Sequence, residues 1–142
     1  MECIIVQSFI KGIIMGTLCN FSELKNVIIH DASALERYNT KSSEHTLSTI
    51  CFKNKSEIES DLLATIIAKS SRKSDVLLND GEIFVLVMPA TDKNGARHIF
   101  EEMHSTCKDV EKVDILSYPE DAFTSTEYYE KISKILNKIK GI

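Results

Sequence analysis

Residues 75–89 constrain the fold more than any other part of the chain. Two apolar runs flank a polar Asn79-Asp80-Gly81 segment, and Pro89 closes the second run. An Asp-Gly step tolerates the positive φ that a tight hairpin turn needs. The second run is rich in β-branched and aromatic residues, which suits a central strand covered on both faces. The sequence therefore predicts a β-hairpin in the middle of a sheet, with its turn at the surface.

Further strands and helices alternate around this hairpin. Residues 46–52 and 112–117 alternate in polarity and contain β-branched residues, so each segment predicts a strand. Tyr118-Pro119-Glu120-Asp121 then ends the second of these strands. The predicted fold class is α/β, an α+β sandwich in which helices flank a mixed, mostly antiparallel sheet with the hairpin at its centre.

Capping signals mark where the helices begin. Capping boxes occur at Ser56–Glu59 and Thr124–Glu127, and Thr91 or Asp92 caps a helix between them. The helix after Ser56 is expected to bury one apolar face, made of Ile58, Leu62, Leu63, Ile66 and Ile67. The last helix is expected to end at Gly141.

The amino-terminal residues 1–29 are predicted to form a helical segment, and residues 30–142 the main domain. One helical stripe is indicated by apolar residues at spacings of three or four, namely Ile10, Ile14, Leu18, Phe21, Leu24 and Ile28. This stripe either packs on the domain's own core or forms a dimerisation interface, and the sequence leaves both open.

Composition and charge exclude several classes of partner. The net charge is −4 and no basic block interleaves with aromatic residues, which argues against nucleic acid. The apolar residues 3–18 are too short and too interrupted for a membrane span. The four cysteines are scattered with no close pair, which predicts reduced, mostly buried thiols, a cytoplasmic protein and no metal site. No cofactor is predicted.

Motifs around the hairpin carry a family resemblance. Arg72-Lys73-Ser74-Asp75 precedes it, Asp80-Gly81-Glu82-Ile83-Phe84 forms its turn, and an apolar strand ending at Pro89 follows. This layout resembles GGDEF (diguanylate cyclase) domains, in which Arg-x-x-Asp precedes a Gly-Gly-Asp/Glu-Glu-Phe turn. Tyr118-Pro119-Glu120-Asp121 also resembles the family's Tyr-Pro-x-Asp. The resemblance covers about the last three quarters of the chain and implies a role in bacterial signal transduction.

The signature itself departs from the family pattern. Asp80 stands at the first glycine position and adds a negative charge where a phosphate or guanine would lie. Gly81, Glu82 and Phe84 match, but Ile83 replaces an acid and cannot bind metal. The strand at residues 46–52 also lacks the aspartates with which cyclases hold magnesium ions. We therefore predict a degenerate GGDEF domain with no catalytic residue and no metal among Asp80, Gly81, Glu82, Ile83 and Phe84.

A nucleotide could still bind outside the lost catalytic centre. Arg72 and Asp75 match the inhibitory site of the family, where the arginine would hold cyclic di-GMP by forked hydrogen bonds. Arg97 is the predicted second arginine of this site. The first hypothesis is thus an inactive regulatory or interaction domain, with cyclic di-GMP or GTP, a protein partner and a second copy as expected partners.

Two alternatives stay open at this point. One is a divergent nucleotide cyclase or nucleotide hydrolase that uses Glu82. The other is a structural interaction domain that binds no small ligand.

Overall fold

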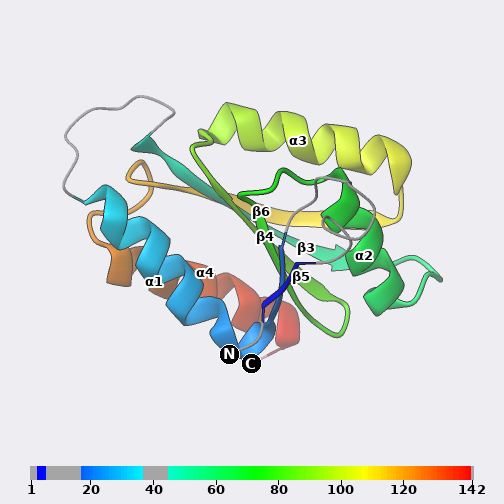
Figure 1. The fold of residues 1–142 in the computed structure, drawn as a ribbon. Coiled ribbons are helices and arrows are strands. Elements are labelled where there is room, and N and C mark those ends of the chain that lie inside the picture. Colours follow the sequence, from blue (N-terminus) through cyan, green and yellow to red (C-terminus); the bar gives the residue numbers. More distant parts are fainter. Residues whose placement is uncertain (1–2, 6–16, 37–44, 142) are drawn as a thin grey trace.

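The computed structural model describes residues 3–5, 17–36 and 45–141, and Figure 1 draws it as a ribbon. The strands of the described residues form one continuous sheet, and helices connect several of them. The elements are β1 (Cys3–Ile5), β2 (Thr17–Asn20), the 3-10 helix η1 (Phe21–Glu23), α1 (Leu24–Leu35), β3 (Leu47–Asn54), α2 (Ser60–Ser70), β4 (Val76–Asp80), β5 (Ile83–Pro89), α3 (Lys93–Thr106), β6 (Val110–Tyr118) and α4 (Ser125–Lys140).

The sheet has the order β1-β2-β4-β5-β3-β6, so the β4–β5 hairpin lies at its centre, as the sequence predicted. All neighbouring strands are antiparallel except β2 and β4, which run parallel. Asp80 pairs with Ile83, and Gly81 takes a φ of 59° in the intervening turn. A glycine with positive φ at the first of two turn positions is what type II′ hairpins require. The mixed, mostly antiparallel sheet with a central hairpin is thus confirmed.

Both faces of the sheet are covered by helices. The helices α1 and α4 lie on one face and pack on Val85 and Val87 of β5, whereas α2 and α3 lie on the other and pack on Leu86 and Met88. Side chains alternate between the two faces of a strand, so a strand buried on both faces is apolar throughout. This explains why the run at Ile83–Pro89 has no polar position.

The structure corrects the amino-terminal prediction. Leu18 belongs to a strand, β2, and the helix α1 begins only at Leu24, so no single helical stripe runs through residues 18–28. Ile10 and Ile14 lie outside the described residues. Nor does a boundary fall at residue 29, because α1 crosses it and Ile28 and Ala32 share one core with α4. Apolar residues at spacings of three or four cannot reveal that β2 pairs with β4, because β4 is distant in the sequence.

The start of α2 is also corrected. The helix begins at Ser60, directly after the predicted capping box and four residues after Ser56, and its N-terminus has no side-chain cap. Ser56 instead accepts a hydrogen bond from the amide of Ile58, in a turn held by Asn54. The buried face is Leu63, Ala64, Ile67 and Ala68, while Leu62 is 56% exposed. The predicted apolar face was therefore too wide. The helix α2 has apolar residues on two neighbouring sides, and only the side with Leu63 and Ile67 packs on the sheet.

The ends of the other two long helices follow the predictions. Asp92 accepts a hydrogen bond from the amide of Gly95 at the start of α3, and Thr124 accepts one from the amide of Glu127 at the start of α4. Gly141 ends α4 with a φ of 78°. These are the interactions that N-cap residues and a terminal glycine supply. The reciprocal bond of the capping box is shifted by one residue, because the Glu127 carboxylate accepts from the amide of Phe123 and not from that of Thr124.

The outer edge of β6 is closed by side chains. The amide of Ile115 donates to the carboxylate of Asp114 at 2.8 Å, and the amide of Ser117 donates to that of Asp121 at 2.8 Å. Two amides on this strand are therefore satisfied without a further strand. Such devices protect sheet edges from pairing with other chains.

The cysteines do not all match the expectation of reduced thiols. Cys19 is disulfide-bonded, whereas Cys51 and Cys107 are free. Positions far apart in sequence become neighbours through strand pairing, and β1 and β2 place position 3 opposite position 19. Cys51 is a core residue, and burial raises the pKa of its thiol to about 12, with the charge of Asp114 adding to the effect.

Within the residues that the structure describes, no helix is both long enough and apolar enough to cross a membrane.

Candidate functional site

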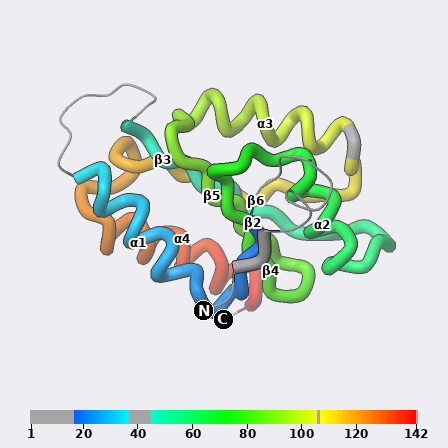
Figure 2. Tube along the Cα trace, viewed as in Figure 1, coloured from blue at the N-terminus to red at the C-terminus, as the bar shows by residue number. Residues whose placement is uncertain are grey.

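The hairpin turn holds the residues that correspond to the signature of the family. The carboxylate of Asp80 lies 2.9 Å from Nζ of Lys140, the last residue of α4. Figure 2 shows this end of α4, in red, beside the green hairpin turn. The same ammonium group lies 4.8 Å from the ring centroid of Phe21. The negative charge of Asp80 is therefore balanced by a lysine of the chain itself.

The next two signature positions face the interior. Ile83 is buried in the core beneath α1 and α4. Phe84 is buried on the opposite face, where its ring stacks on Phe52 with centroids 5.2 Å apart. Both side chains belong to the core, and neither is available to a ligand. The Glu82 side chain projects from the exposed turn, while its backbone carbonyl accepts a hydrogen bond from Asn54.

The end of β3 lies beside this turn, where the resemblance would place metal-binding aspartates. Lys53 pairs with Ile83, and Asn54 follows it. The Asn54 amide group organises the loop to α2, because its Oδ1 accepts from the Ser56 amide and its Nδ2 donates to the Ile58 carbonyl, each at 2.9 Å. Among the described residues no three His, Cys, Asp or Glu side chains gather in a group that could hold a metal ion.

A cleft of about 600 Å³ opens next to the turn, between α2, β2 and β4. Its polar lining includes the carboxylate of Asp61, two side-chain amides and the carboxylate of Asp80, which is paired with Lys140. The lining residues are Leu18, Cys19, Asn20, Phe21, Asp61, Ala64, Thr65, Asn79, Asp80 and Gly81.

The structure brings Arg72 and Asp75 together, as the sequence predicted for a ligand site, but they bind each other. Arg72 Nη2 donates to Asp75 Oδ1 at 2.8 Å, and the Arg72 amide donates to Oδ2 at 2.9 Å. The same Nη2 donates to the Pro89 carbonyl at 2.9 Å and to the Thr91 hydroxyl at 2.5 Å. The carboxylate is 2% exposed and the guanidinium side chain 46%. The hydrogen bonds of Arg72 therefore connect the loop before β4 to the loop after β5.

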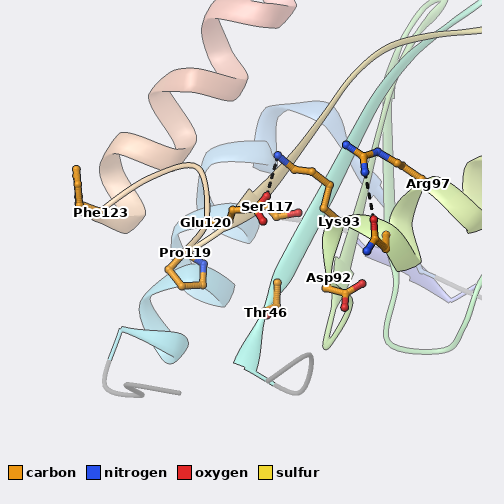
Figure 3. Close-up of a pocket in the computed structure, with 9 residues that line it drawn as sticks. Thr46, Asp92, Lys93, Arg97, Ser117, Pro119, Glu120 and Phe123 are labelled. Carbon is orange, nitrogen blue, oxygen red and sulfur yellow. Dashed lines mark hydrogen bonds and ion pairs between the residues drawn. The ribbon is translucent and has the colours of Figure 1, made fainter. Parts of the chain in front are cut away.

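Arg97 does not join that pair. Arg72 and Asp75 line a pocket of about 370 Å³ between α2 and α3, whereas Arg97 lines a separate cleft of about 840 Å³ at the start of α3. Arg97 Nη1 instead donates a hydrogen bond to the side-chain oxygen of Asn94, on the same helix, at 3.1 Å (Figure 3). The three predicted ligand residues are thus split between two sites.

A lysine in the larger cleft is tied to two acids. Lys93 Nζ lies 2.9 Å from Glu120 and 2.7 Å from Asp121. Desolvation acts to lower the pKa of Lys93, but the hydrogen bonds to Asp121 and Glu120 outweigh it and raise the pKa. This ion pair joins the start of α3 to the loop after β6, so Tyr118-Pro119-Glu120-Asp121 has a structural role here.

Sequence reasoning missed two residues. Lys140 is one of several lysines in the last helix, and no local signal in the sequence distinguishes it from the others. Phe123 is 93% exposed, the most exposed large apolar residue described. Its position directly before the capping residue Thr124 was a signal that could have been used, because residues there normally pack against the helix.

Comparisons with known proteins do not test the resemblance to GGDEF domains, which stays a prediction from the sequence. No protein-family model matches the chain, and a comparison with curated proteins finds no match either.

Proposed function

We propose that the chain is a GGDEF-like domain without nucleotide turnover that acts as a regulatory or interaction module in signal transduction. The observation that carries the proposal is the ion pair between Asp80 and Lys140 at the hairpin turn. In this family the turn is where the backbone approaches the nucleotide. Here the turn carries a side chain, and that side chain is already paired.

The chemistry of cyclisation supports the same proposal. A cyclase must hold two triphosphates, neutralise them with metal and activate a 3′-hydroxyl group. A magnesium ion that neutralises a triphosphate is held by carboxylate oxygens that converge on it. Ile83 is buried, and the end of β3 presents Lys53 and Asn54 in place of acids. Glu82 is an exposed acid of the turn, and one carboxylate does not replace a set of metal ligands.

Incubation of purified protein with GTP and Mg²⁺ or Mn²⁺ tests this proposal. The expected result is no cyclic di-GMP and no GTP hydrolysis above the protein-free control. Turnover that is lost in Glu82→Ala would replace the proposal with the divergent cyclase or hydrolase. Glu101→Ala is the matched control, because Glu101 is an exposed acid on α3, away from the turn.

Cyclic di-GMP binding at Arg72 and Asp75 is a second candidate activity. Its support is that both residues line the 370 Å³ pocket and that the arginine side chain is nearly half exposed. A guanine or phosphate group would have to displace the internal hydrogen bonds of the pair. Isothermal titration with cyclic di-GMP, and with GTP, tests it: heat that disappears in Arg72→Ala but persists in Lys73→Ala supports binding, and no heat with the unmutated protein removes it.

The third candidate, an interaction domain with no small ligand, follows if both titrations are flat and the molar mass depends on concentration. A cytoplasmic location is part of the proposal, since two cysteines are free. The disulfide at Cys19 weighs against it. Thiol labelling of the protein in a fresh cytoplasmic extract distinguishes the two states of Cys19.

A further inference from the structure

The pocket between α2 and α3 has mainly apolar walls. Both helices cover the same face of the sheet (Figure 1), and Leu86 of β5, which is 1% exposed, reaches the pocket from the sheet. Its volume is about 370 Å³. Sites for small molecules are typically concave and mostly apolar, with volumes of about 300–1,000 Å³. The apolar part of the lining consists of Ile66, Ile67, Leu86, Ile99, Met103 and Cys107.

One polar group in the lining has unused donors. Arg72 Nε and Nη2 donate to the two carboxylate oxygens of Asp75, and Nη2 also donates to the Pro89 carbonyl. The guanidinium is planar, so these bonds fix its plane and leave the two N–H groups of Nη1 on another edge. Nη1 has no hydrogen bond or ion pair among the described residues, and the side chain is 46% exposed. The pocket therefore has a preorganised donor for a hydrogen-bond acceptor.

The charges in the lining favour a neutral ligand over an anion. The positive charge of Arg72 is balanced by Asp75, which lines the same pocket. The other ionised group in the lining is Glu102, which is 69% exposed and lies 3.0 Å from His98. The lining thus has no excess positive charge. An anionic group on Nη1 would lie near the carboxylate of Asp75 without a second cation to balance it.

We propose that this pocket binds a small neutral molecule that is mostly apolar and carries one hydrogen-bond acceptor, such as a carbonyl oxygen, for Arg72 Nη1. An apolar cavity of about 150 Å³ holds a benzene molecule in another protein, so this pocket has room for a ring and a short chain. The proposal rests on the regulatory function proposed above and gives it a ligand of another class. Cyclic di-GMP, the second candidate above, would bring two phosphates to a lining that favours neither charge nor a large polar surface.

Three one-ring probes test the proposal with the full chain: acetophenone, which has a carbonyl; ethylbenzene, which has no acceptor; and benzoate, which is an anion. Methionine-methyl NMR is the readout. The Met103 signal should shift, whereas that of Met88, which is fully buried and outside the lining, should not. Acetophenone should bind with a dissociation constant of about 1 mM or lower, and benzoate at least about tenfold more weakly.

Two variants locate the contacts. Ile99→Trp, in the pocket lining, should fill the pocket and weaken acetophenone binding at least about tenfold. Leu62→Trp is the matched control, because Leu62 is exposed on α2 and lies outside the lining. Arg72→Lys keeps a positive charge but removes Nη1. It should weaken acetophenone binding about fivefold and leave ethylbenzene binding within about twofold, which also shows that the pocket is intact.

Several results would overturn the inference. They are an unmoved Met103 signal with acetophenone up to about 10 mM, equal binding in Ile99→Trp, benzoate binding as tight as that of acetophenone, or acetophenone binding that Arg72→Lys leaves unchanged. The GTP assay tests the lack of turnover separately. A protein that is inactive toward GTP and does not bind acetophenone would end the inference and keep the proposed function.

Discussion

The pair of Arg72 and Asp75 allows a quantitative test of whether these residues hold the fold together. Replacing Arg72 by Ala leaves a carboxylate that is 2% exposed without its charged partner. Removing one partner of a buried ion pair costs about 3–5 kcal/mol. The guanidinium is half exposed and the Arg72 amide still donates to Asp75 Oδ2, so we expect about 2 kcal/mol of lost unfolding free energy.

Asp75→Ala should cost about as much, because it removes the acceptor of both the guanidinium and the Arg72 amide. The two substitutions remove the same interaction, so their effects should not add. We expect the double variant to lose about 1–2 kcal/mol less than the sum of the single variants. Lys73→Ala, at an exposed neighbouring position, should lie within about 0.5 kcal/mol of wild type.

The assay is urea unfolding followed by far-ultraviolet circular dichroism, since the chain has no tryptophan to serve as a fluorescent probe. An unfolding free energy of Arg72→Ala within about 0.5 kcal/mol of wild type, or strictly additive single effects, would refute the reasoning. Arg72 and Asp75 would then be available to a ligand, and this result would favour the hypothesis that they bind cyclic di-GMP.

Three further predictions concern the framework of the site. Gly81→Ala should lower the unfolding free energy by about 1–2 kcal/mol in the same urea assay, because alanine is strained at the φ of 59°, and an unchanged value would contradict this turn geometry. Tyr128→Phe should lose about 1–3 kcal/mol, because it leaves the buried Thr49 hydroxyl without its partner, and a thermal melt that matches wild type would contradict it. The hydrogen bond from the Ser125 amide lowers the pKa of the Glu36 carboxyl. The stability that this hydrogen bond contributes is therefore present above the ordinary pKa of glutamate and is lost as the pH falls through the lowered pKa. An NMR titration of the Glu36 carboxyl should show a midpoint below 4.5, and an ordinary midpoint would contradict the contact.

The candidate site was only partly readable in the sequence. Arg72 and Asp75 were predicted to lie together, and they do, because a three-residue spacing at the end of a helix is a local property. Arg97 was grouped with them and lies in another cleft, because the position of α3 relative to α2 depends on how both pack on the sheet. Lys140 reached Asp80 from the far end of the chain, and no spacing rule could have indicated that contact.

The sequence by itself determined the elements whose signals are local. The Asp80-Gly81 turn, the double-sided apolar strand after it and the caps at Asp92 and Thr124 all depend on residues a few positions apart. Tertiary structure alone decided that β2 pairs with β4, which stripe of α2 is buried, and that Phe123 stays outside the core. Those outcomes depend on which surfaces meet when distant segments pack together, and that is a property of the whole chain.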